Sequence, residues 1–218
     1  PNYNLPWVRY DPLGRQMALS ASWDAMQTAL AHAGKASPVE QAMIKALTAR
    51  YPQREAIDDM APWDKAYTAE MRKIFAAYPD DLEVRAVFAE SIMNETPWQM
   101  WDLPSGKPAE GAGTEECRAV LEYALERIPA AWDHPGLLHL YVHLMEMSPF
   151  PQRALRAGDR LRELVPDSGH LIHMPTHLDV LCGHYRDVLV HNQKALETDR
   201  RFLAYSDDPG VYLVYVIH

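Results

Sequence analysis

The chain has 218 residues, of which 48% are hydrophobic and 23% charged, a composition typical of a globular protein with ample material for a core. Its formal net charge of -9 argues against nucleic acid or an anionic membrane as a partner, because both require clustered lysine and arginine. No apolar run is long enough to cross a bilayer, and Cys117 and Cys182 are too few for a disulfide framework, so we expect a soluble cytoplasmic protein.

The N-terminal half of the chain has the pattern of two successive helical hairpins. Apolar residues recur at intervals of three and four from residue 15 onward, and Gly34 offers a stop for the first helix. Ser37 and Glu40 have the spacing of a capping box, with Pro38 at the first position of the second helix. We expect helices over residues 15–33, 38–51, 62–77 and 82–94.

A long segment without helical periodicity follows. Residues 95–113 contain three prolines and three glycines, with Trp98 and Trp101 near the start. This insertion is longer than an ordinary connection between helices, and such segments often serve as a lid or a binding loop. A surface loop that the two tryptophans anchor is the other interpretation, and the sequence alone leaves both open.

The C-terminal half returns to helical alternation, with each expected helix closed by proline or glycine. Helix pairs at a fixed spacing predict a solenoid in which each repeat packs on the next. Period-two alternation, the pattern of a strand, occurs only at residues 211–217, which equally fit the start of another helix. We expect helices over residues 115–128, 135–147, 152–165, 169–182 and 185–203.

Two copies of one short histidine pattern lie within these helices. The first copy has His139 and His143, the second has His173 and His177, and equivalent histidines are 34 residues apart. Residues at i and i+4 share a face of a helix, and equivalent helices of successive repeats lie side by side, so the four imidazoles are expected to meet in one groove. Pro175 weakens this argument for the second pair, because proline starts or kinks a helix.

The surrounding stretches resemble a bacterial and fungal subset of tetratricopeptide-repeat proteins. This subset carries His-Pro-Gly-x-x-His-x-Tyr-x-His, followed by Gly-His-x-x-His-Met-Pro-x-His, and the two stretches stand here at residues 134–143 and 169–177. The resemblance implies an all-α fold of antiparallel helix pairs that form a right-handed solenoid. It also implies one repeat domain over residues 1–218, with the insertion at 95–113 and a possible truncation of the array after His218.

The phasing of such repeats implies which side chains face the concave groove. In this family the first helix of each pair lines the groove with its second, fifth, ninth and twelfth positions. If Pro135 and Gly169 are the first positions of two such helices, each helix places a row of polar residues in the groove. If Leu82 and Gly210 are the first positions of two others, each of these adds the residue at its ninth position. The residues expected in the groove are His139, His143, Glu146, His170, His173, His177, Glu90 and His218.

This concentration of imidazoles predicts a transition-metal site. Nitrogen-rich ligand sets suit copper, iron, nickel or zinc, whereas calcium and magnesium require oxygen. Glu146 or Glu90 is expected to serve as a fifth ligand, or as a catalytic side chain that fixes the tautomer of an imidazole. The preferred ligands are His139, His143, His173 and His177, with His134, His170 and His218 as further candidates.

Several functions remain open at this stage. A site with an open coordination position predicts metal-dependent catalysis, redox or hydrolytic, on a small molecule, whereas four protein ligands predict a structural zinc. The spacing of His143 and Glu146 also resembles that of carboxylate-bridged dimetal sites, although the usual order is Glu-x-x-His in two copies. The rival from another class is a peptide-binding repeat scaffold, in which the metal is structural or absent and the histidines are hydrogen-bonding groups.

Overall fold

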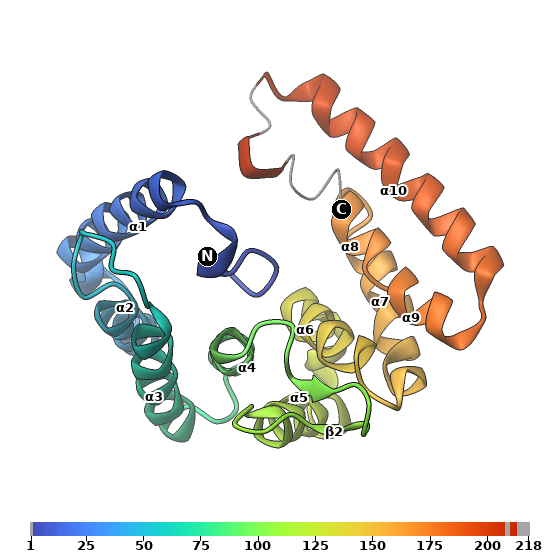
Figure 1. The fold of residues 1–218 in the computed structure, drawn as a ribbon, viewed down its shortest axis with the longest axis horizontal. Helices are drawn as coiled ribbons and strands as arrows, with labels where there is room; N and C mark the ends of the chain where they lie inside the picture. Colours follow the sequence, from blue (N-terminus) through green and yellow to red (C-terminus); the bar gives the residue numbers. More distant parts are fainter. Residues whose placement is uncertain (1, 208–209, 213–218) are drawn as a thin grey trace. The chain divides into compact units, whose positions relative to one another are not determined.

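The computed structural model describes residues 2–207 and 210–212 and is mostly helical, which confirms the all-α prediction (Figure 1). Within these residues, no helix combines the length and apolar character that crossing a membrane requires. The helices are α1 (Pro12–His32), α2 (Pro38–Arg50), α3 (Ala61–Ala77), α4 (Leu82–Glu95), α5 (Thr114–Arg127), α6 (Pro135–Glu146), α7 (Leu155–Leu164), α8 (Gly169–His173), α9 (Thr176–Cys182) and α10 (Tyr185–Tyr205). Short 3-10 turns lie at Trp7–Arg9, Ala33–Lys35, Pro129–Asp133, Pro151–Ala154 and Gly210–Tyr212.

Side chains identified in the sequence begin several of these helices. The capping box before α2 is confirmed, since Glu40 N donates to Ser37 Oγ (3.4 Å) and Ser37 N donates to Glu40 Oε2 (2.8 Å). At the start of α6, His134 occupies the N-cap position, where its Nδ1 accepts from Leu137 N (3.2 Å). The capping interaction therefore gives His134 a structural role at the entrance to the histidine-bearing helix.

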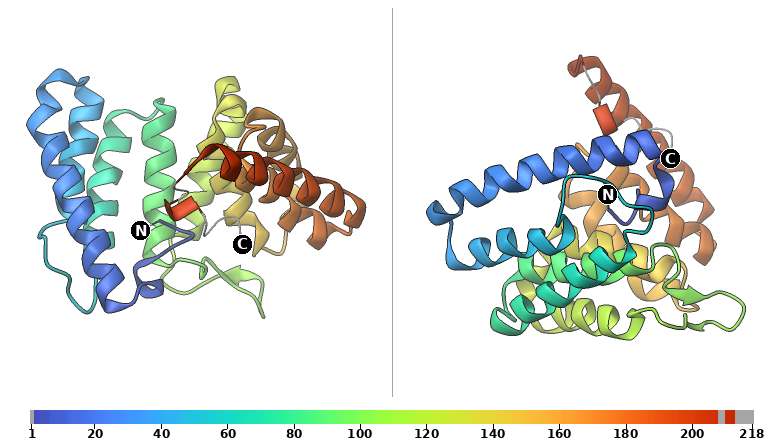
Figure 2. Two further views of the ribbon diagram at one scale, coloured as in Figure 1. Left: turned by 90° about the horizontal axis from the view of Figure 1, so that it is seen from above. Right: turned by 60° about the vertical axis from the view of Figure 1, so that its left-hand side comes forward.

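The chain divides into two compact units, which are described separately. The first comprises Pro1–Asp102 with Pro108–Leu121, and the second comprises Leu103–Lys107 with Glu122–His218. In the first unit, α1 packs on α2, α2 on α3, and α3 on α4, so the four helices lie side by side in series (Figure 2). The prediction of one continuous repeat domain stays a prediction.

The insertion after α4 holds the only strands among the described residues, and the sequence did not indicate them. Strands β1 (Trp101–Asp102) and β2 (Lys107–Pro108) pair as a two-stranded sheet. Trp98, with its φ of 62°, brings its ring to 4.9 Å from the ring of Tyr3, and Trp101 is buried. Both tryptophans thus anchor the loop, as one of the two interpretations expected, while a lid function stays a prediction. The strand considered at 211–217 falls mostly outside the described residues, and Gly210–Tyr212 forms a 3-10 turn.

In the second unit, the helix expected over 169–182 is broken into α8 and α9. Met174 and Pro175 separate the two helices, as the ring and missing N–H of proline dictate. Helix α7 packs closely on the break, because a Cβ added at Gly158 would lie 2.8 Å from Cβ of Pro175. Helix α10 runs along α8 and α9, and α6 packs on α7 and α9. The break lies between the two histidine-bearing segments, although Met174 and Pro175 keep backbone angles in the right-handed helical region.

A buried ion pair joins α7 to α9. Arg162 Nη2 donates to Asp179 Oδ2 at 2.9 Å, and both residues are almost fully buried. Asp159 Oδ1 lies 3.8 Å from the same Arg162 Nη2, but the side chain of Asp159 is 70% exposed. Because removal of one partner of a buried pair leaves an uncompensated charge, the Arg162–Asp179 contact is expected to contribute strongly to the position of α9.

We predict that Asp179→Ala lowers the free energy of unfolding by about 3–5 kcal/mol, since it leaves the guanidinium of Arg162 buried without its main counter-charge. Urea denaturation followed by circular dichroism measures the change. The matched control is Asp159→Ala, which removes an exposed carboxylate from the same arginine and is expected to cost less than about 1 kcal/mol. Equal losses in the two variants would contradict this role.

Candidate metal centre

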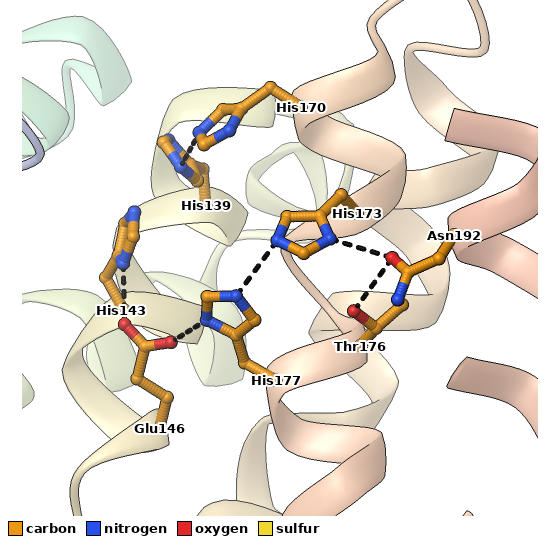
Figure 3. A network of polar contacts seen from close by, with 8 residues as sticks. All are labelled: His139, His143, Glu146, His170, His173, Thr176, His177 and Asn192. Atoms are coloured by element: carbon orange, nitrogen blue, oxygen red, sulfur yellow. Dashed lines mark hydrogen bonds and ion pairs between the residues drawn. The ribbon is translucent and has the colours of Figure 1, made fainter. Parts of the chain in front are cut away.

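Helix α6 presents three polar side chains on one face. His139, His143 and Glu146 follow the i, i+4, i+7 spacing of a single helical stripe and point to the same side in Figure 3. His143 and Glu146 are buried, while His139 is half-buried. The ring centroids of the two histidines lie 4.6 Å apart. The rest of α6 is strongly apolar, so this stripe is the polar exception in a helix that is otherwise core.

His170 of α8 completes a group with two of these residues. The Nε2 atoms of His139 and His170 lie 3.3 Å apart, and each of the residues His139, His143 and His170 offers a ligand atom within 4.8 Å of the other two. Among the described residues, this is the group of three or more histidine, cysteine, aspartate or glutamate side chains close enough to hold a metal ion. Three imidazoles from two helices therefore lie close together, and because two bonds of about 2.1 Å span at most about 4.2 Å, the most distant pair would have to move closer to share one ion.

The spacing of the first pair agrees with metal coordination. With zinc–nitrogen bonds of about 2.0–2.1 Å, two nitrogens 3.3 Å apart would subtend about 107° at the ion, close to a tetrahedral angle. His139 is also held in the form that binds metals, because burial and the nearby His143 and His170 lower its pKa well below the usual range. A neutral imidazole keeps the lone pair that a metal ligand requires.

Glu146 links this group to the second histidine pair. His143 Nδ1 lies 2.8 Å from Glu146 Oε1, and His177 Nδ1 is in hydrogen-bonding contact with Oε2 of the same carboxylate (Figure 3). Burial raises the pKa of Glu146, but the hydrogen bonds from His143 and His177 outweigh it and bring the pKa to about 2. The ionised carboxylate only accepts, so both Nδ1 atoms donate to it, and a neutral imidazole that donates from Nδ1 keeps its lone pair at Nε2.

His173 and His177 form a pair of their own. Their Nε2 atoms lie 3.0 Å apart, and His173 Nδ1 donates to Asn192 Oδ1 (2.7 Å), which also accepts from Thr176 Oγ1 (3.2 Å). The ligand set predicted from the sequence took two histidines from each motif copy. The structure instead groups His170 with the two histidines of α6, while His177 contacts Glu146 and His173 contacts Asn192.

The remaining candidates from the sequence have other surroundings. His134 caps α6 through its Nδ1. Glu90 belongs to α4 in the first unit, where Asn94 Nδ2 donates to its Oε1 (3.4 Å). His218 lies outside the described residues. Sequence reasoning missed Asn192 and Thr176, and neither stands in a pattern that marks a partner for histidine; only the proximity of α10 to α8 and α9 places Asn192 there.

No protein-family model, curated protein or solved structure matches this chain.

The low pKa of Glu146 predicts a defined pH dependence of stability. The pKa of the carboxyl falls from the ordinary 4.5 to about 2 in the folded protein, so its contribution is present above pH 4.5 and is lost as the pH falls toward 2. Glu146→Gln is expected to lower the free energy of unfolding by about 3 kcal/mol at pH 7, a difference that shrinks below pH 4.5. Urea titrations of the metal-free protein from pH 2 to 7 measure it.

The control for this prediction is Glu163→Gln, which changes an exposed carboxylate of α7 by the same isosteric substitution. The difference between Glu163→Gln and the unaltered protein should stay small at every pH. If the Glu146→Gln difference did not depend on pH, the carboxylate would not be held ionised by the two imidazoles.

Proposed function

We propose that this protein binds a transition-metal ion through His139, His143 and His170 and uses it for catalysis on a small molecule. The observation that carries the proposal is the convergence of three imidazoles, with ligand atoms within 4.8 Å of one another, beside a carboxylate that orients one of them. Glu146 acts in this proposal as a positioning residue, because it contacts the Nδ1 of His143 and leaves the opposite nitrogen for the metal.

The ligand set narrows the choice of metal. Three imidazole nitrogens suit zinc, copper or iron, and nickel is compatible with them. Neither Cys117 nor Cys182 belongs to the three-histidine group. The proposal therefore includes no thiolate ligand of the kind that selects copper(I) or iron–sulfur clusters. The type of donor atom does not distinguish among these metals. At equal concentrations of the divalent ions, the general order of metal affinities favours copper(II).

The number of protein ligands supports catalysis over a purely structural metal. Structural zinc sites are closed by four protein side chains, whereas catalytic sites keep three and leave a position for water or substrate. The group here has three members. A metal held in this way lowers the pKa of a bound water or polarises a substrate oxygen, which are the roles that hydrolytic or redox chemistry on a small molecule requires.

We further propose that the helices are tetratricopeptide-like repeats. Helices α6 and α8 begin 34 residues apart, at Pro135 and Gly169, the repeat length of that family. Each begins directly after a capping residue, and the fifth residue of each is a histidine, His139 in α6 and His173 in α8. A solenoid of such repeats has a concave groove, which is where a small substrate would reach the ion. A peptide-docking scaffold without metal is the competing function, and metal analysis distinguishes the two.

Metal analysis of untagged protein tests the proposal. After chelator treatment and equilibration with Zn²⁺, Co²⁺ or Cu²⁺, we expect tight stoichiometric binding by isothermal titration calorimetry and by elemental mass spectrometry. His139→Ala, His143→Ala and His170→Ala are each expected to weaken binding by more than the roughly 10–100-fold typical of losing a partner that orients a ligand. His32→Ala, at an exposed histidine of α1, is the matched control and should bind as the unaltered protein does. Failure of the unaltered protein to bind any of the three metals would favour the peptide scaffold.

The open coordination position has its own test, which needs no knowledge of the substrate. Cobalt-loaded protein should change its visible absorption when azide is added, because a small anion can occupy the position that three protein ligands leave free. The Glu163→Gln variant is expected to respond in the same way. Tight cobalt binding with no response to azide would identify a closed structural site and contradict catalysis.

A further inference from the structure

His173 and His177 form a pair that does not belong to the three-histidine group. Their Nε2 atoms face each other at 3.0 Å, and their ring planes are nearly perpendicular, at 85°. The two residues come from different helices, α8 and α9, on either side of the break at Pro175. The pair keeps the i, i+4 spacing of the first motif copy, and its ring centroids lie 4.8 Å apart, close to the 4.6 Å of His139 and His143.

Oxygen acceptors hold the far side of both rings. His177 Nδ1 donates to the carboxylate of Glu146, and His173 Nδ1 donates to Asn192 Oδ1 at 2.7 Å, an oxygen that Thr176 also supplies with a hydrogen bond. An imidazole protonated at Nδ1 carries a lone pair at Nε2. In neutral rings of this kind two lone pairs face each other at hydrogen-bonding distance, and a proton or a metal cation between them would stabilise the contact.

The distance agrees with coordination of one ion by both rings. With metal–nitrogen bonds of about 2.0–2.1 Å, nitrogens 3.0 Å apart subtend about 94°, the angle between neighbouring ligands in square or octahedral geometry. Copper(II) and nickel(II) prefer such angles. Two imidazoles leave further coordination positions for water or for oxygen atoms of a substrate.

We propose that His173 and His177 bind a second transition-metal ion, so that the protein carries a two-metal centre with Glu146 shared between both ligand sets. One oxygen of Glu146 orients His143 of the first site, and the other orients His177 of the second (Figure 3). The carboxylate is not a direct bridge here; it contacts the Nδ1 side of one ligand in each set. This proposal rests on the proposed function for the first ion, at His139, His143 and His170. The ion at His173 and His177 is a second one and is counted separately.

The experiment counts ions per chain in the full-length, untagged protein. Apo-protein titrated with Cu²⁺ or Ni²⁺ is expected to bind two ions, measured by elemental mass spectrometry after gel filtration. The double variant His173→Ala/His177→Ala should bind one ion, and so should His139→Ala/His170→Ala. The control His32→Ala should bind two. Circular dichroism checks that each variant remains folded.

A milder variant keeps the test informative if the double variants do not fold. Asn192→Ala removes the oxygen that orients His173 without removing a ligand, and it is expected to weaken one of the two binding events by roughly 10–100-fold while leaving the other unchanged. Equal weakening of both events, or of neither, would contradict a second ion on His173.

The possible results separate this inference from the proposed function. One ion per chain that survives His173→Ala/His177→Ala overturns the second site and leaves the first intact. One ion lost in both double variants means that a single metal uses all the histidines, which also overturns the second site. Absence of bound metal in the unaltered protein overturns both proposals together.

Discussion

The candidate centre depends on one carboxylate that two imidazoles share. Glu146 is buried on α6, and its charge would be costly there without the N–H groups of His143 and His177. The same contacts fix the protonated nitrogen of both rings. The opposite nitrogens face two directions, one toward His139 and one toward His173, and they are the atoms proposed as metal ligands. A single side chain thus organises the orientation of two neighbouring groups.

The fold around Glu146 keeps these groups in place. Pro175 divides α8 from α9, and His173 and His177 lie on either side of this division with their Nε2 atoms 3.0 Å apart. Gly158 allows α7 to pack on that break, and the buried contact of Arg162 with Asp179 ties α9 to α7. Residues that are not proposed as metal ligands therefore help to position the helices that carry the imidazoles.

Much of this fold follows from local patterns in the sequence. The capping box at Ser37, the proline and glycine stops and the three- and four-residue periodicity located the helices to within a few residues, because these signals act over single turns. The two short strands in the insertion were missed, since two-residue strands have no periodicity to detect. Assembly of the helices into one continuous solenoid is a long-range property, and it stays a prediction.

The site was predicted less completely, for a physical reason. The 34-residue offset drew attention to both motif copies, and the four-histidine set took one i, i+4 pair from each, although Pro175 weakened that argument for the second pair. His170 and not His173 lies beside His139, although both belong to α8, and which of them approaches α6 depends on tertiary packing that local patterns do not encode. Asn192 could not be found at all, because its role arises from the packing of α10 on α8 and α9.

The most direct measurement is a crystal structure of metal-soaked protein with anomalous diffraction data collected at the absorption edge of that metal. Our account predicts an anomalous peak bonded to nitrogens of His139, His143 and His170, with Glu146 still in contact with His143 Nδ1. A metal peak bonded elsewhere, or no peak at these three imidazoles in protein soaked with zinc, cobalt and copper, would contradict it.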